Sequence, residues 1–251
     1  MSQYRHKTFA AFSEIDSSSV LENQKVQALK AINHQADDYI LNVNKAEYIE
    51  HLVFEYSIQP LLIHADQLSV SVEERMIPAE LYPSAFWVER GKSYPKDVYI
   101  FHLPFSGDTQ LLRIRASSFS MSSPHIMISD QEIQFEIINF NKEAEAIKSE
   151  ANRVVDQLTS QNQRLTNDLE KFNCSLKSQM SQAFDSRKQQ LLKKHDFISA
   201  LGVPVRKAKN TPSTFSIPTE RTPVIPNKPK PKVATSLVQK SFGSKVSVVS
   251  S

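Results

Sequence analysis

The chain has 251 residues, of which 40% are hydrophobic and 23% are charged, as in an ordinary soluble protein. Its four glycines disfavour a glycine-rich phosphate-binding loop, because such loops need several glycines for tight turns. The single cysteine, Cys174, excludes an intramolecular disulfide and a cysteine-based zinc cage. No apolar run approaches the about 20 residues of a membrane-spanning helix, and the N-terminus lacks an apolar signal core. We therefore expect a cytoplasmic protein without a membrane partner.

Charge is distributed unevenly along the chain. Residues 203–251 contain nine Lys or Arg and one acid, a net charge of 9 − 1 = +8. The whole chain carries +3, so residues 1–202 carry 3 − 8 = −5. Seven of the 13 prolines also lie after residue 202. This contrast predicts a mildly acidic body followed by a basic, disordered tail over 203–251.

The first part of the chain reads as a polar, flexible arm over 1–18 and then as short helices. Apolar residues recur at helical spacing behind two start signals, the second of which is Asn44 followed by Glu47. We expect two or three helices within 19–57, ended by Pro60.

After Pro60 the apolar residues change from helical spacing to alternation with polar residues, which predicts strands. Alternation of apolar and polar residues covers 68–72, 98–103, 112–116, 126–128 and 133–137, with turn compositions between them. Short strands without intervening helices favour a small, mostly antiparallel sheet. The fold class is therefore α+β, with an α+β head domain over 19–140.

The segment 141–202 predicts a long helical stalk, because 141–200 contains neither Gly nor Pro. Its apolar stripe has a mean spacing of about 3.6 residues, typical of a straight helix. The pattern leaves open whether the stalk is one helix or a hairpin. A small head cannot cover so long a stripe, so we expect the stripe to contact a second copy or a partner helix. Its contact residues are Ile147, Val154, Leu158, Leu165, Leu169, Phe172, Leu176, Met180, Leu191 and Ile198.

Candidate chemical sites are sparse. No histidine pair has zinc-site spacing, and neither a nucleophile elbow nor a nuclease acid–lysine pair lies on a convincing strand. We expect no catalytic residue, metal or cofactor. Arg113 and Arg115 share one strand face and could contact an anion, although ion pairs with the acids of 132–136 are the simpler interpretation.

Basic residues of the tail offer a second kind of site. Lys228, Lys230 and Lys232 alternate with proline and could contact nucleic acid through its phosphates. Aromatic residues are rare among them, so the sequence supports base stacking only weakly, and a solvated linker is the alternative interpretation.

Four blocks carry a resemblance to known proteins: VYIFHLPFSGD at 98–108, RKQQLL at 187–192, LGVPVRK at 201–207 and PSTFSIP at 212–218. They are similar to a poorly characterised bacterial group suspected of anti-phage defence, over about residues 20–220. Many members continue into a domain like a restriction endonuclease, which has no counterpart here. The resemblance attaches no chemical role to these blocks, and it implies an N-terminal sensing or assembly module whose effector is separately encoded, or a truncated copy of a longer protein.

Together these observations lead to three hypotheses. The first is a non-catalytic sensing, oligomerisation or scaffold module that acts through the long helix. The second is a nucleic-acid-binding accessory protein that uses the basic tail. The third is a hydrolase whose site has no recognisable motif.

Overall fold

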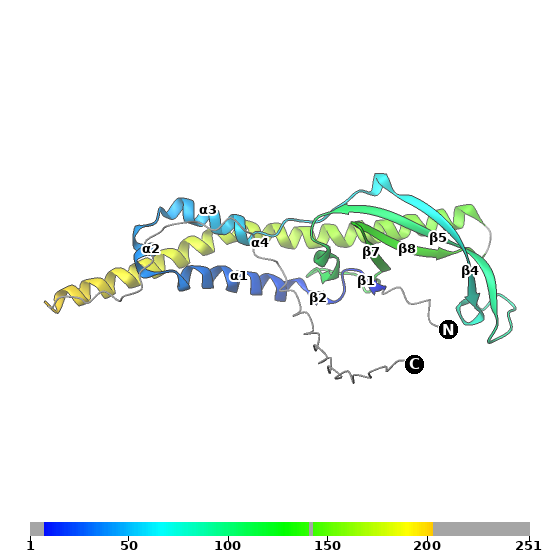
Figure 1. The fold of residues 1–251 in the computed structure, drawn as a ribbon, viewed down its shortest axis with the longest axis horizontal. Coiled ribbons are helices and arrows are strands. Elements are labelled where there is room, and N and C mark those ends of the chain that lie inside the picture. Colours follow the sequence, from blue (N-terminus) through cyan, green and yellow to red (C-terminus); the bar gives the residue numbers. More distant parts are fainter. Residues whose placement is uncertain (1–7, 141–142, 203–251) are drawn as a thin grey trace, which may run out of the picture.

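The computed structural model describes residues 8–140 and 143–202. One helix, α4 (Ala144–Ala200), runs the length of the molecule (Figure 1). A curled sheet lies along the N-terminal half of α4, and three shorter helices lie along its C-terminal half. The α+β class is confirmed, and the long segment is a single continuous helix.

The three short helices are α1 (Ser17–His34), α2 (Asp37–Asn42) and α3 (Lys45–Tyr56). The start signal at Asn44 is confirmed: its side chain accepts from the amide of Ala46 at 3.0 Å and donates to Glu47 at 2.9 Å. Helix α1 buries residues four apart, Val20, Gln24, Ala28 and Ile32. This spacing gives the helix one face that packs on α4.

The sheet has six strands in the order β1-β7-β8-β5-β3, and β4 pairs with the same edge of β5 as β3. All its pairings are antiparallel. The strands are β1 (Phe9–Ala10), β3 (Leu62–Ile63), β4 (Ser69–Pro78), β5 (Ser93–Ser106), β7 (His125–Ser129) and β8 (Glu132–Ile138). A separate two-stranded sheet pairs β2 (Ile15–Asp16) with β6 (Ile114–Arg115) in parallel.

The sequence predicted two segments incorrectly. Residues 8–18 do not form a loose arm, because β1 and β2 pair with β7 and β6 and the side chain of Phe12 is buried. The strand expected over 112–116 is limited to β6 (Ile114–Arg115), because Leu112 and Arg113 belong to a 3₁₀ turn (Thr109–Arg113). The Asp108 carboxylate starts this turn by accepting from the amide of Gln110 at 2.9 Å. Long-range strand pairing ordered the first segment, and a local cap replaced part of the strand that periodicity favoured in the second.

The two faces of the sheet pack against different parts of the chain. Phe101, Leu103 and Phe105 of β5 point into the main core, which they share with α4 and α1–α3. Alternate residues Val98 and Ile100 belong to a smaller cluster on the other face. The side chains of Tyr82, Ile138 and Phe140 pack against that cluster. Over the remainder of this outer face the strands carry polar side chains.

Candidate functional site

The apolar stripe of α4 faces the chain's own helices and sheet. Eight of the ten residues expected to contact a partner are at most 8% exposed within this single chain: Val154, Leu158, Leu165, Leu169, Phe172, Leu176, Met180 and Leu191. The structure corrects the expectation that they form a free surface, because α1, α2 and α3 cover the half of α4 that the sheet leaves uncovered. Ile147 and Ile198, near the ends of the helix, are only half-buried.

Phe184 is a core residue that the predicted stripe missed. A step of three residues after Met180 would place Ala183 in the stripe, but the fully buried side chain is Phe184, four residues after Met180. Its ring centroid lies 5.9 Å from that of Tyr48 on α3. Residues three and four positions apart both lie on one face of an α-helix. Spacing alone therefore could not decide whether Ala183 or Phe184 is the buried residue.

Polar residues beside the stripe attach extended segments of the head to α4. Asn173 accepts from the backbone amide of Ile58 at 3.0 Å and donates to its carbonyl at 2.8 Å. Asn162 donates to the carbonyl of Leu61 at 2.9 Å. Arg187 donates to Asp37 at 3.0 Å. Asn162 and Arg187, which interrupt the apolar pattern, therefore bind the head's own chain and not a partner.

Asp168 joins α4 to two other segments. Its carboxylate accepts from the amide and hydroxyl of Ser117, both at 2.7 Å, and from the hydroxyl of Ser17 at 3.0 Å. Partial burial by itself would raise the pKa of Asp168, but these three donors favour the charged form and lower the pKa below its ordinary value. The carboxylate is therefore ionised at neutral pH and stabilises the fold in that form.

Arg113 and Arg115 are engaged within the chain. Arg113 donates to both carboxylate oxygens of Glu14 at 2.7 Å, and Arg115 donates through its Nε to Asp16 at 3.0 Å. The guanidinium of Arg113 also stacks on Phe9, 4.1 Å from the ring centroid. Structural ion pairing therefore describes them better than contact with an anion, although their acidic partners are Glu14, just before β2, and Asp16, within β2, and not the acids of β8.

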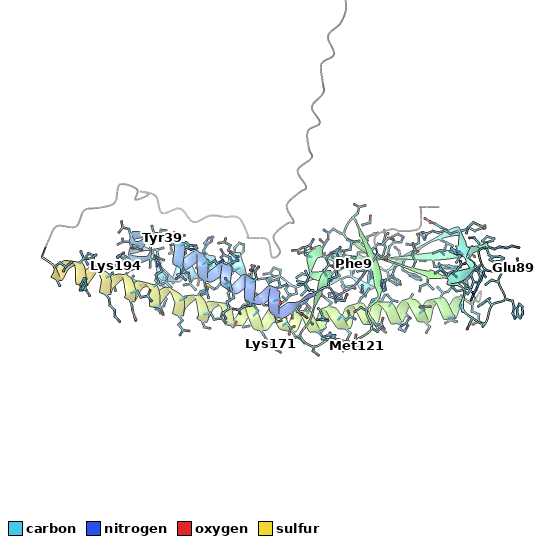
Figure 2. All side chains as sticks on the ribbon, turned by 90° about the horizontal axis from the view of Figure 1, so that it is seen from below. Phe9, Tyr39, Glu89, Met121, Lys171 and Lys194 are labelled. Atoms are coloured by element: carbon cyan, nitrogen blue, oxygen red, sulfur yellow. The ribbon has the colours of Figure 1, made fainter. Side chains whose placement is uncertain are left out.

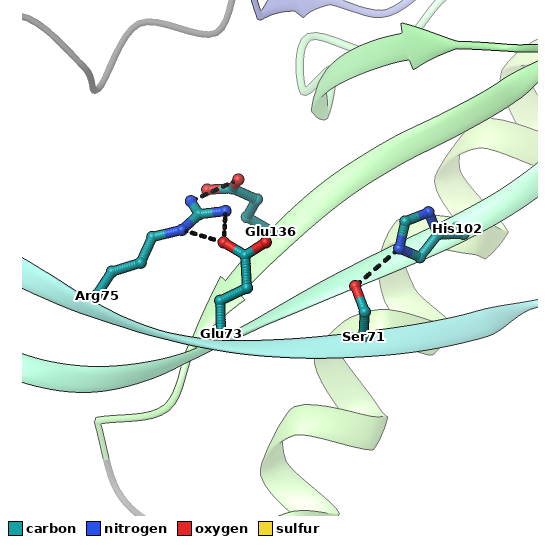
Figure 3. Close-up of polar contacts among 5 residues, drawn as sticks. All are labelled: Ser71, Glu73, Arg75, His102 and Glu136. Carbon is teal, nitrogen blue, oxygen red and sulfur yellow. Dashed lines mark hydrogen bonds and ion pairs between the residues drawn. The ribbon is translucent and has the colours of Figure 1, made fainter.

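The outer face of the sheet carries two hydrogen-bonded networks, parts of which are shown in Figure 3. Arg75 bridges Glu73 and Glu136, each at 2.8 Å. His102 lies 2.9 Å from the Ser71 hydroxyl through Nε2 and 3.1 Å from Glu132 through Nδ1.

The serine, histidine and carboxylate of the second network stand in the order of a nucleophilic triad. Ser71, however, lies on a regular exposed strand and not on a strained turn. Neither cavity described below includes Ser71, His102 or Glu132. The network therefore holds β4, β5 and β8 together.

A groove of about 820 Å³ follows one flank of α4 between Glu145 and Arg164. The loop that carries Met121 crosses α4 here and forms a wall of the groove (Figure 2). The lining is polar and comprises Ser120, Ser122, Glu145, Lys148, Ser149, Asn152, Arg153, Asp156, Gln157, Ser160, Gln161 and Arg164. The sequence analysis missed this site, because the loop that completes it lies more than 20 residues away along the chain.

Gln161 holds the loop against the groove. Its side-chain amide donates to the carbonyl of Ser122 at 2.9 Å and to the hydroxyl of Ser120 at 3.3 Å. The residue is only 5% exposed, and its Oε1 has no hydrogen-bond donor within the described part of the chain. A buried acceptor without a donor costs free energy, so this atom lowers the stability gained from holding the loop against α4.

A second cavity, of about 340 Å³, lies where α4 begins beside the aromatic loop at 83–86. Its lining includes Phe86, Ile137, Phe140 and Ile147, with Glu143 and Glu150 among the polar members. Ile147, one of the two half-buried stripe residues, thus borders a cavity of its own chain.

The C-terminal end of α4 is the one stretch of that helix where large apolar side chains are exposed. Leu192, Phe197 and Leu201 are 46%, 68% and 56% exposed. This end extends beyond α2, and Lys194 near it lies at the opposite end of the molecule from Glu89 (Figures 1 and 2).

Other searches of the described residues were negative. Within 8–140 and 143–202, no cluster of three or more His, Cys, Asp or Glu could hold a metal ion. In the same ranges, no helix combines the length and apolar character needed to cross a membrane. Lys228, Lys230 and Lys232, the predicted nucleic-acid contacts, lie outside the described residues. No family model, curated protein or solved structure matches the chain.

Proposed function

We propose that this chain is a non-catalytic scaffold module that self-associates through the C-terminal end of α4. One observation carries the proposal: the chain itself covers the apolar stripe as far as Leu191 and leaves the following turns exposed. Phe197 and Leu201 are four residues apart, so they lie on one face of the helix and present adjacent apolar surface. A second copy of the same helix end is the occupant that we propose.

The remainder of the molecule supports a spacer role. Fifty-seven residues of helix span about 85 Å at 1.5 Å per residue. Packing on both the sheet and the short helices keeps this length in one rigid body, so the sheet end and the exposed helix end are held at a fixed separation. Holding two surfaces apart requires no chemistry.

The sequence resemblance extends this proposal to a biological setting. We propose that the scaffold belongs to a bacterial defence system and that a separately encoded effector binds to it. Co-purification of the full chain with the product of the adjacent reading frame would support this partner. Failure of that product to bind would leave self-association as the whole of the proposed function.

The oligomeric state of the full chain tests self-association. By analytical ultracentrifugation we expect a mass that is a multiple of the 28.5 kDa monomer. Joint Phe197→Glu and Leu201→Glu substitution should give the monomer mass with unchanged thermal stability, because these side chains contact little of their own chain. Ser199→Glu on the same turn is the control and should leave the mass unchanged. A wild-type monomer at the highest soluble concentration would refute the proposal.

A further inference from the structure

We infer that the groove on the flank of α4 binds single-stranded nucleic acid. The groove follows the helix from Glu145 to Arg164, about 28 Å at 1.5 Å per residue. That length and the open, polar lining suit a short stretch of polymer better than an enclosed small molecule. The loop at Ser120 and Ser122 forms one wall of the groove, and a flexible single strand can follow the face of α4 beside it.

Two arginines place positive charge along the floor of the groove. Arg153 and Arg164 are eleven residues apart, three helical turns, so they lie on nearly the same line of α4 about 16 Å apart. Arg164 has no ion-pair partner among the described residues, and Arg153 has only the exposed Glu150 at 3.3 Å. Guanidinium groups at this separation can contact two phosphates of one strand a few nucleotides apart.

Neutral groups between the arginines supply the remaining contacts. The serine hydroxyls and Gln157 can donate to phosphate or base oxygens. At the loop, Met121 is 96% exposed, and the ring of Phe119 lies against Arg115 at 4.6 Å. Met121 stands between the lining residues Ser120 and Ser122 and adds exposed apolar surface at this wall of the groove.

Acidic residues in the groove limit the affinity. Glu145 and Asp156 belong to the lining, and residues 1–202 as a whole are negatively charged. Asp156 lies three residues after Arg153 and repels a phosphate bound there. Binding should therefore be modest and strongly salt-dependent, and neutralising Asp156 should strengthen it. A merely structural groove would not respond to that substitution.

Fluorescence anisotropy of the full chain with labelled oligo-dT and oligo-U tests the site. Joint Arg153→Glu and Arg164→Glu substitution should weaken binding at least about tenfold, because two phosphate contacts become repulsive. The control, Lys171→Glu with Lys177→Glu, makes the same charge change on α4 outside the groove and should weaken it much less. Asp156→Asn should bind more tightly than wild type. Circular dichroism verifies that each variant is folded.

Further measurements distinguish binding in the groove from binding by the tail, and a single strand from a duplex. Oligo-dT and oligo-U distinguish DNA from RNA as the source of the strand. Replacing Lys228, Lys230 and Lys232 by alanine in the full chain measures any contribution of the tail, and the groove variant should still weaken the binding that remains. No binding at low salt, equal effects of the groove and control variants, or tighter binding of duplex than of either strand would overturn the inference. The groove lies about 50 Å along α4 from Phe197, so loss of self-association leaves this test unaffected.

Discussion

Leu165→Ala gives the most direct test of the conclusion that the stripe of α4 is an internal interface. Leu165 is 1% exposed and belongs to the main core. Substitution of a buried leucine by alanine costs about 2–5 kcal/mol, and the cost rises when the surroundings cannot collapse into the cavity. Asn162 and Asp168, one turn away on either side, fix α4 to the head by hydrogen bonds and restrict such collapse. We therefore expect a loss of about 3–4 kcal/mol in the free energy of unfolding.

Thermal and urea denaturation at several protein concentrations measure this effect. For a folded unit of this size the loss corresponds to a decrease of about 6–15 °C in the midpoint temperature. The difference from wild type should not depend on protein concentration, because the contacts that are lost lie within one chain. Leu192→Ala, on the same helix but exposed, is the control and should change stability by about 0.5 kcal/mol or less. A Leu165→Ala effect that grows on dilution would place the stripe between chains and refute the reasoning.

Two further predictions concern the polar attachments of α4. Asp168→Asn should lower the urea midpoint at neutral pH, since the amide loses the charge that Ser117 and Ser17 stabilise. The pKa of Asp168 is lowered in the fold, so its contribution is complete above the ordinary aspartate pKa and is lost as pH falls through the lowered value. The two midpoints should therefore converge in acid, and a constant difference would contradict this account. Asn173→Ala should cost about 1–3 kcal/mol in urea denaturation, because both backbone groups of Ile58 lose their partner. Asn167→Ala, at an exposed position of α4, should have little effect, and equal losses would show that Asn173 has no special role.

Much of the local structure could be predicted from the chain alone. The absence of Gly and Pro over 141–200 predicted a helix, and α4 is continuous over Ala144–Ala200. Period-two alternation located β4, β5, β7 and β8, and Asn44 marked the start of α3. These features depend on near neighbours in the chain, because caps and strand alternation act over a few residues.

Tertiary structure decided what each surface contacts. The stripe from Val154 to Leu191 predicted burial without naming the covering element, and only the fold shows that α1–α3 and the sheet supply it. The pairing of Arg113 with Glu14, and the crossing of the 120–122 loop over Gln161, likewise join segments far apart in sequence. The spacing of apolar residues shows which face of a helix will be buried. Which element packs on that face depends on contacts between residues far apart in the chain. The same reason explains why the groove on α4 and the exposed end at Phe197 emerged only from the folded chain.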